Sequence, residues 1–435
     1  MQILKNAAWT FLDTAAISFS RILLAVILSW VFGAAGYGIF QLSITTISLM
    51  ASLAVVGLSI ANNFLAGRFQ EKLASILGNS VTFSLAAGTA IGLITFIGML
   101  LLEHSVFAEV PRSFWGWILV SIPLQTLNMA LSGILFGRNL FRTKFLGTSI
   151  QFGFLALGVG VAAAAKWLSL SLLLPFWVLC LIWADAYWLF TLLKMTAWTI
   201  RLDRKLLKEQ LTYGGYAFLY NMAHLLNFRL DLLLVAYFLD ARNVGWYSLA
   251  SSITEALLYL PKSFGVAILT KTAAESSRTE TSSYKLAYKG VNLSIVLLSI
   301  LVAAAAPFVI PLVFSSNFIP VVKPLWLLIP GTIAMALGIL ASFHLFGLGN
   351  ARLPSQAALA AMVATVVLDI ILIPVLGIQG AALASSISYT LFMWFAVRGI
   401  IKALGTSVRE LMVPTLEDAK TLIRIGLRGL KHVRP

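Results

Sequence analysis

The sequence has little charge. Only 11% of its 435 residues are charged and 60% are hydrophobic, with a mean hydropathy of +0.94. A soluble domain usually carries about 25% charged residues. No water-soluble core could hide this much apolar surface, so the composition indicates a protein whose solvent is lipid.

Features of other protein classes are scarce as well. The one cysteine, Cys180, allows no intramolecular disulfide, and we expect it to lie inert in the core. The sequence holds no G-x-x-x-x-G-K-[ST] run, which argues against a bound ATP. Its polar interruptions are short, so we expect no soluble catalytic domain and no enzyme. The first apolar stretch is too long for a signal-peptide core, and we expect it to stay as a helix.

Long apolar stretches fill most of the chain instead. A membrane-spanning helix needs about 20 apolar residues. We predict twelve, at residues 9–32, 40–61, 79–102, 114–136, 145–165, 170–193, 213–238, 246–270, 290–314, 324–347, 353–376 and 378–400. The resulting fold class is an all-α integral membrane protein.

The net charge of +15 has a topological explanation. Cytoplasmic loops of membrane proteins are enriched in Lys and Arg. With the N-terminus inside, the inner loops and termini hold 24 of the 31 basic residues and the outer loops hold four. This asymmetry predicts that both termini are cytoplasmic and argues against nucleic-acid binding.

The interruption at 194–212 divides the chain into two sets of six spans that begin alike. Arg21 precedes FGAAGYGIF, and Arg229 precedes LDARNVGWY. Gly38 follows Arg21 by 17 residues, and Gly245 follows Arg229 by 16. Six spans return the chain to one side, so the halves would be related by an axis along the membrane normal. We predict four parts: an N-terminal six-helix bundle (1–193), a cytoplasmic linker (194–212), a C-terminal six-helix bundle (213–401) and a basic tail (402–435).

Six charged residues lie inside the first, seventh and eighth expected spans. A charge near the bilayer centre costs at least ~2.5–3.5 kcal/mol, so such residues face water or a partner. The six are Asp13, Arg21, Arg229, Asp231, Glu255 and Lys262. At about 100° per residue, polar stripes form on the first two spans of each half. We expect these stripes to line one aqueous cavity, although isolated Ser and Thr usually join helices. Arg229 lies about 160° from Asp231 and off its stripe.

The residue types of these stripes suit an anionic glycan headgroup. Arg binds phosphate as a fork and Lys as a point charge, which makes Arg21, Arg229 and Lys262 the candidates for pyrophosphate or acidic sugars. Aromatic rings with hydroxyls suit sugar faces, and the candidates are Tyr213, Tyr216, Tyr220, Tyr259 and the polar Gln41. The candidates for cavity lining or for coupling to Na⁺ or a proton are Asp13, Asp231, Glu255 and His224.

Four motifs in order also resemble a known family. They are GAAGYGIF (33–40), LDARNVGWYSLASSITEALLYLP (239–261), FGLGNARLPSQ (346–356) and LIPVLGIQGAALASSISY (372–389). They are similar to the polysaccharide exporter branch of the multidrug/oligosaccharidyl-lipid/polysaccharide (MOP) flippase superfamily, the Wzx-type repeat-unit flippases. The resemblance implies a MATE-like fold of two pseudo-symmetric six-helix bundles with a central cavity and alternating access.

The resemblance also implies a function. Such a protein carries undecaprenyl-pyrophosphate-linked oligosaccharide from the inner to the outer leaflet of the bacterial cytoplasmic membrane. Its expected partners are this lipid-linked substrate, membrane lipids, a glycan polymerase and glycosyltransferases, and we expect a monomer. Rival functions are a lipid II flippase or a cation-coupled multidrug antiporter of the same superfamily, a membrane polymerase or ligase, and a scaffold. Residues 415–433 read as a basic amphipathic helix on the inner leaflet.

Overall fold

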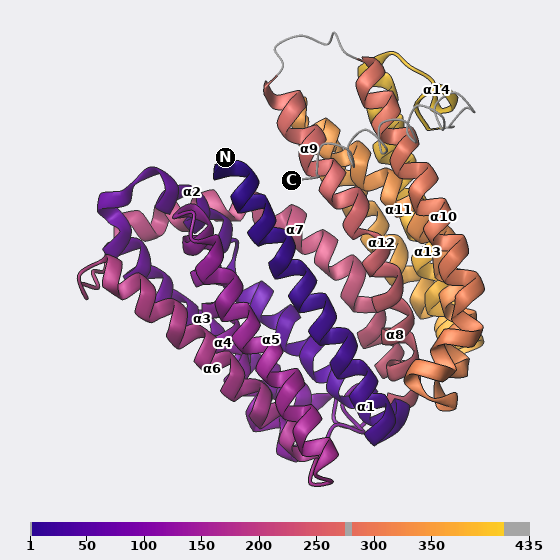
Figure 1. The fold of residues 1–435 in the computed structure, drawn as a ribbon, viewed down its shortest axis with the longest axis horizontal. Helices are drawn as coiled ribbons and strands as arrows, with labels where there is room; N and C mark the ends of the chain where they lie inside the picture. Colours follow the sequence, from indigo (N-terminus) through magenta and orange to yellow (C-terminus); the bar gives the residue numbers. More distant parts are fainter. Residues whose placement is uncertain (1, 275–280, 413–435) are drawn as a thin grey trace, which may run out of the picture. The chain divides into compact units, whose positions relative to one another are not determined.

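The computed structural model describes residues 2–274 and 281–412, and all regular structure within them is helical (Figure 1). By length and composition, ten helical stretches among these residues can cross a membrane. They cover every span expected from the sequence except 213–238, and the first two expected spans share one stretch, Leu12–Val55. The prediction of an all-α membrane protein is therefore confirmed. The basic helix expected at 415–433 lies outside the described residues.

The two spans that share one stretch are joined at a glycine. α1 (Gln2–Val55) contains both, and Gly33 lies between its two parts with φ 64° and ψ −166°. Glycine adopts positive φ without the steric cost that a Cβ imposes. The seventh expected span lies within α7 (Arg204–Phe238), a helix of 35 residues.

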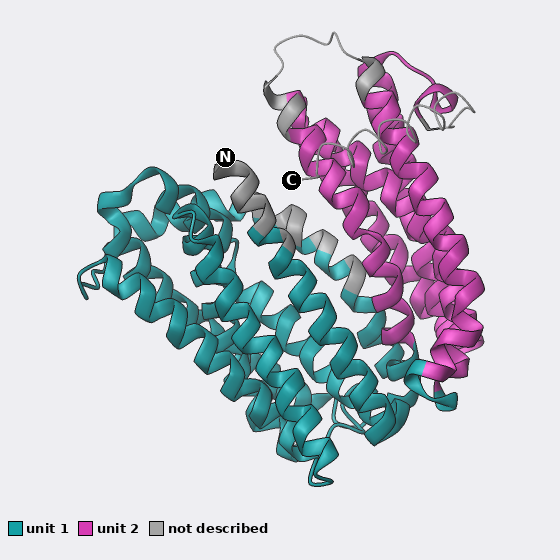
Figure 2. Cartoon of the chain, in the orientation of Figure 1, with its two compact units in different colours: residues 1–246, 313–317 teal, residues 247–312, 318–435 magenta. Residues whose placement is uncertain are grey.

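The chain forms two compact units (Figure 2). Unit 1 comprises Met1–Trp246 with Val313–Asn317, and unit 2 comprises Tyr247–Leu312 with Phe318–Pro435. The division follows Trp246, inside α8 (Ala241–Leu257), so α7 belongs with the first six spans in unit 1. The two six-helix bundles expected from the sequence stay a prediction.

Unit 1 has an apolar core near the ends of its helices. Besides α1 and α7 it contains α2 (Leu58–Arg68), α3 (Leu73–Leu101), α4 (Arg112–Gly137), α5 (Phe141–Ala164) and α6 (Leu173–Met195). Its core includes Leu65, Ile76, Leu131, Trp188 and Leu206. Since Leu206 opens α7, burial here attaches the start of α7 to the preceding helices.

Unit 2 is built around α11. Its helices beyond α8 are α9 (Tyr259–Ala274), α10 (Thr281–Phe314), α11 (Val322–Gly347), α12 (Arg352–Leu376), α13 (Ile378–Leu404) and α14 (Val408–Met412). The core contains Tyr288, Leu340, Leu345, Ile400 and Leu411, all at most 1% exposed. Leu411 lies in α14, so the short last helix packs on the core.

The repeated glycines of the two half-chains meet inside unit 1. A Cβ added to Gly38 would lie 1.8 Å from the carbonyl oxygen of Ala241, and one added to Gly245 would lie 2.1 Å from that of Ala34. The contact is reciprocal, as in an interface related by two-fold symmetry. Glycine is required at both positions because the backbones of α1 and α8 touch.

Candidate functional site

The six membrane charges are divided between the two units. Asp13, Arg21, Arg229 and Asp231 lie in unit 1, whereas Glu255 and Lys262 lie in unit 2. Each unit therefore contributes cations and carboxylates of its own.

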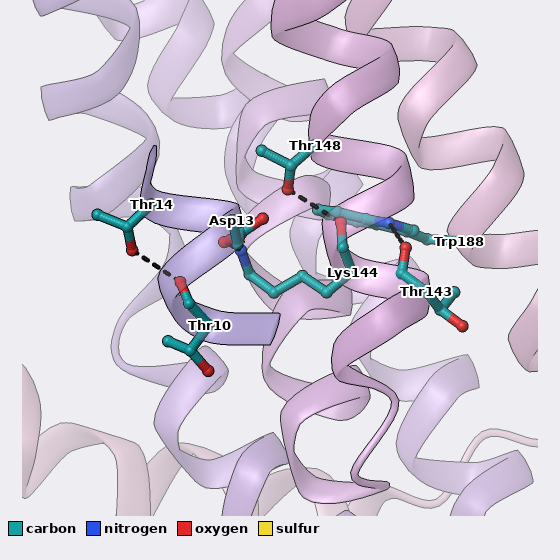
Figure 3. Close-up of polar contacts among 7 residues, drawn as sticks. All are labelled: Thr10, Asp13, Thr14, Thr143, Lys144, Thr148 and Trp188. Atoms are coloured by element: carbon teal, nitrogen blue, oxygen red, sulfur yellow. Dashed lines mark hydrogen bonds and ion pairs between the residues drawn. The ribbon is translucent and has the colours of Figure 1, made fainter. Parts of the chain in front are cut away.

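Asp13 of α1 forms an ion pair with Lys144 of α5 (Figure 3). The Asp13 side chain is 8% exposed and the Lys144 side chain 12%, so the pair is buried. The sequence interpretation placed Lys144 in a cytoplasmic loop, but it is the fourth residue of α5. Removing one member of a buried pair costs about 3–5 kcal/mol, because the other charge is left alone. Asp13 thus joins two helices of unit 1.

The start of α5 is hydrogen-bonded to α6, and the Lys144 side chain extends from this turn toward α1. The Trp188 indole donates a hydrogen bond to the Thr143 carbonyl at 3.1 Å. The same indole covers Gly147, where a Cβ would lie 1.9 Å from its nitrogen. The Thr148 hydroxyl donates to the Lys144 carbonyl at 3.0 Å (Figure 3). These contacts fix the backbone of the α5 turn that carries Lys144.

Arg21 lies further along the same pair of helices. It is exposed, and its guanidinium carbon lies 5.4 Å from the centre of the Phe152 ring. Arg21 follows Asp13 by eight residues, and Phe152 follows Lys144 by eight, so α1 and α5 run parallel in constant register. A cation over an exposed ring gains about 0.5–1 kcal/mol. This contact orients the guanidinium of Arg21.

The site residues of α7 differ in burial. Asp231 is 3% exposed and accepts a hydrogen bond from the Leu232 amide at 2.7 Å, while Arg229 is half-buried. Tyr213 is exposed and stacks on Phe64 of α2, with ring centres 4.7 Å apart. The side chains of three further candidates, Tyr216, Tyr220 and His224, lie outside the described residues. The half-buried Gln41 lies in α1.

In unit 2, the helix of the eighth expected span is interrupted near Pro261. α8 ends at Leu257 and α9 begins at Tyr259. Proline lacks an amide hydrogen, so it cannot donate to the carbonyl four residues earlier. Glu255 and Lys262 lie on opposite sides of this break, both half-buried, and Tyr259 between them is exposed. The break separates the carboxylate and the ammonium group onto two helices.

A neutral polar network in unit 1 was missed in the sequence. We call it the Gln210 network; it contains Asn62, Asn79, Ser80 and Gln210, each at most 2% exposed. The Gln210 amide donates to Asn62 at 2.7 Å and accepts from Asn79 at 3.0 Å. Asn62 also donates to Ser80 at 2.8 Å. Asn79 exchanges two hydrogen bonds with the backbone of Asp203, which caps α7 through its own carboxylate.

The network attaches α7 to α2 and α3. At the next turn of α7, Gly214 meets Gly57, and a Cβ on Gly57 would lie 2.1 Å from the Gly214 oxygen. Gly57 has φ 72° and precedes α2. Isolated polar residues in apolar stretches would have been the signal for this network, but the partners are far apart in the chain.

Other buried polar residues have structural partners. Asn128 donates to Asp185 at 2.7 Å, which joins α4 to α6. His344 is 1% exposed and packs its ring 4.5 Å from that of Tyr284. Cys180 is buried, as expected. Among the described residues, no group of three or more His, Cys, Asp or Glu is placed to hold a metal ion.

A family profile described as polysaccharide biosynthesis protein matches residues 35–323, more than half of the chain. The chain belongs to this polysaccharide biosynthesis family. The match begins near the first repeated glycine, covers most of unit 1 and extends into unit 2 as far as residue 323. A search of curated protein sequences gave no match.

Solved structures share the fold. The lipid II flippase MurJ in an inward closed conformation aligns with a TM-score of 0.72 over 98% of this chain and 93% of that one, at 17% identity. An inward-facing MATE family multidrug resistance transporter of the MOP superfamily aligns at 0.70, over 92% and 95%, with 16% identity. A MOP superfamily transporter from Pyrococcus furiosus aligns at 0.63, over 93% and 96%, with 17% identity.

Family and fold together confirm two predictions from the sequence. The chain has the MATE-like fold, and it belongs to a polysaccharide biosynthesis family. It is accordingly a multi-pass membrane protein.

Proposed function

We propose that this protein is a flippase that carries undecaprenyl-pyrophosphate-linked oligosaccharide repeat units to the outer leaflet of the bacterial cytoplasmic membrane by alternating access. The observation that carries the proposal is a polysaccharide biosynthesis family match on a chain with a transporter fold. The fold similarity to MurJ, described as a lipid II flippase, supports a lipid-linked cargo.

The proposed headgroup contacts follow from charge and shape. Arg21, Arg229 and Lys262 would bind the pyrophosphate, because guanidinium and ammonium groups suit phosphate oxygens. Arg21 is exposed and its guanidinium lies over the Phe152 ring, which supports this role. The tyrosines 213, 216, 220 and 259 and Gln41 would contact sugars, while the polyprenyl tail stays in lipid.

The proposed energy source is an ion gradient or the membrane potential. An inside-negative potential favours outward movement of an anion by ~2.3 kcal/mol per charge per 100 mV. Asp231, Glu255 and His224 would bind the coupling proton or Na⁺. For Asp13 to do so, it would first have to release Lys144, since the two form a buried pair.

The proposed orientation places both termini in the cytoplasm. The excess of Lys and Arg in alternate loops supports it. In unit 1, the Asn79–Asp203 hydrogen bonds place the first turns of α3 beside the segment before α7. That proximity is consistent with four intervening spans that return the chain to one side.

Reconstitution tests the function directly. Liposomes that contain the purified protein and a fluorescent lipid-linked oligosaccharide should lose inner-leaflet label to an external glycosidase, with a rate that depends on an imposed potential. Arg21→Gln should reduce this rate roughly tenfold or more, the value of one lost charge-assisted contact. Arg112→Gln is the control, because Arg112 pairs with Glu103 at the protein surface.

A rival function makes the opposite prediction about charge. The rival is a cation-coupled drug antiporter, because the fold is similar to that of a multidrug resistance transporter. Efflux of an organic cation by this protein, with no exposure of labelled oligosaccharide, would establish the antiporter and reject the flippase. A translocation rate unchanged in Arg21→Gln, with Lys262→Gln unchanged as well, would reject the cationic headgroup site.

A further inference from the structure

An exposed cluster of rings and cations lies at the end of α2. The guanidinium carbon of Arg68 lies 5.8 Å from the centre of the Phe64 ring and 5.4 Å from that of Phe69. The Phe64 ring stacks on Tyr213 of α7, with centres 4.7 Å apart and planes inclined by 11°. Lys72 lies 4.9 Å from the centre of Phe69. We call these five residues the Arg68 platform.

Local structure explains the arrangement. Phe64 and Arg68 are four residues apart on α2, so they share a helix face. α2 ends at Arg68, and Phe69 leaves the helix with φ −119° and ψ 83°, which turns its ring back toward Arg68. Tyr213 reaches Phe64 because α7 approaches α2 closely at Gly214 and Gly57. The platform is therefore built on the same helix contact as the Gln210 network.

The guanidinium of Arg68 contacts two aromatic rings rather than a carboxylate. Among the described residues, no carboxylate lies within ion-pair distance of Arg68, and Glu71 of the following turn forms no such pair. Arg138, the next cation, donates to Gln70 at 3.3 Å. A stacked guanidinium keeps its in-plane N–H groups available for phosphate oxygens.

The two stacked rings are exposed, at 40% for Phe64 and 43% for Tyr213. Flat aromatic surfaces beside a cation match a ligand that has an apolar face next to an anion. A sugar attached to phosphate has both features, whereas a bare phosphate or a phospholipid headgroup lacks the ring face. The hydroxyl of Tyr213 adds a hydrogen-bonding group at the edge of the stack.

We infer that the Arg68 platform binds the glycosyl phosphate of a lipid-linked sugar, with the phosphate on Arg68 and Lys72 and the first sugar on Phe64 and Tyr213. The inference rests on the proposed function for the identity of the lipid, and it assigns residues outside the six membrane charges. Since Arg68 lies at a helix end, the platform would receive the headgroup before the membrane-embedded residues do.

A second cation–aromatic cluster provides a matched control. Lys194 lies 4.3 Å from the centre of the Phe190 ring, and Trp198 meets that ring edge-on at 75°. The loop of this cluster is joined to the α3 end of unit 1 through the Arg201–Ala74 backbone hydrogen bond. It has a cation and rings but neither a guanidinium fork nor parallel-stacked rings. Lys194→Gln should therefore leave glycosyl phosphate binding unchanged.

The test uses the full-length protein in phosphatidylcholine nanodiscs. The probe is a short-chain polyprenyl diphosphate that bears one N-acetylhexosamine with a photoreactive diazirine. Mass spectrometry of the crosslinked peptides should locate the sugar at residues 62–72 and 212–214. Arg68→Gln should weaken this crosslinking roughly tenfold at subsaturating probe, as expected for one lost charge-assisted contact. Tyr213→Leu should reduce the preference for the sugar-bearing lipid over the sugarless diphosphate.

Three results would overturn the inference. They are crosslinks confined to other segments, crosslinking unchanged in Arg68→Gln, and equal displacement of the probe by phosphatidylglycerol and by the sugar-bearing lipid. The last would identify a general anionic-lipid site. Unaltered thermal unfolding of the variants would show that they fold. Crosslinking at the Arg68 platform without translocation in liposomes would reject the flippase function and support the platform. Translocation without crosslinking at the platform would support the flippase function and reject the platform.

Discussion

Two of the buried polar contacts in unit 1 join helices by different chemistry. The Asp13–Lys144 pair joins α1 to α5 through opposite charges, and one oxygen of Asp13 has no hydrogen-bond partner among the described residues. The Gln210 network joins α7 to α2 and α3 through neutral groups, and its amide oxygens and nitrogens have partners. Removal of either member of a charged pair leaves the other charge buried and unpaired. In a neutral network whose groups all have partners, removal of one residue breaks only some of several hydrogen bonds.

The comparison also bears on transport. A carboxylate with an unused oxygen can accept a proton or a cation when its partner moves, whereas every group of the Gln210 network is already engaged. We therefore expect α7 to move with α2 and α3 as one body, and we expect any rearrangement within unit 1 to involve the α1–α5 contact.

The largest effect is expected from breaking the charged pair. Lys144→Met leaves the Asp13 carboxylate buried alone and should destabilise the protein by about 3–5 kcal/mol. The double variant Asp13→Asn with Lys144→Met should recover most of this loss, because no uncompensated charge remains. Thermal unfolding in detergent measures both. Equal melting temperatures for the single and double variants would contradict the importance of the pair.

Breaking the neutral network should have a smaller effect. Gln210→Leu leaves the Asn62 oxygen and an Asn79 N–H without their partner and should cost about 1–3 kcal/mol. Gln151→Leu is the matched control, because Gln151 is 3% exposed and its amide nitrogen has no partner among the described residues. Hydrogen exchange across residues 196–212 should rise in the first variant only. Similar exchange in both variants would contradict the attachment of α7 by the Gln210 network.

Displacing α7 from α2 should weaken the same network indirectly. Gly214→Ala brings a methyl group within 2.7 Å of the Gly57 backbone, and overpacking of this kind costs about 1–3 kcal/mol. Gly215→Ala should be close to neutral, since nothing lies within 4 Å of its added Cβ. Urea unfolding compares the two adjacent substitutions. A Gly215→Ala loss as large as that of Gly214→Ala would show that helix propensity, not the close approach, decides stability.

The smallest effect is expected at an exposed ion pair. Lys285 of α10 donates to Glu410 of α14 at 2.6 Å, and Thr406 donates to it at 3.0 Å. These contacts lower the pKa of Glu410 below its ordinary 4.5, with the Lys285 hydrogen bond as the largest cause. A lowered pKa stabilises the folded form above the unfolded value and is lost as pH falls through the folded one.

A fluorophore on α14 should therefore report looser docking as pH falls below 4.5, with little change from pH 6 to 8. Glu410→Gln should remove this dependence at low salt. Docking that still weakens equally with pH in Glu410→Gln would assign the titration to another group. The exposed Lys285–Glu410 pair and the buried Asp13–Lys144 pair have the same charges. Their comparison shows how far burial, rather than charge alone, determines the contribution of an ion pair to stability.

Several structural features were predictable because they depend on local composition. Apolar runs located the spans. The repeat of Gly38 and Gly245 was visible in the sequence, although their mutual contact was not. Of the site residues, the cations and carboxylates were recognised by their cost in lipid, while Asn62, Asn79 and Gln210 were not, because neutral amides carry a weaker signal.

By itself, the sequence determined that the chain is an integral membrane protein, that its helices span the membrane, and that charges inside them require water or partners. Hydrophobicity and helical period decide these properties within single segments. Only the tertiary structure decided that Lys144, not one of the other five membrane charges, is the partner of Asp13, and that α7 is joined to α2 and α3. Such pairings depend on the register between helices far apart in the chain, which no single helix pattern contains.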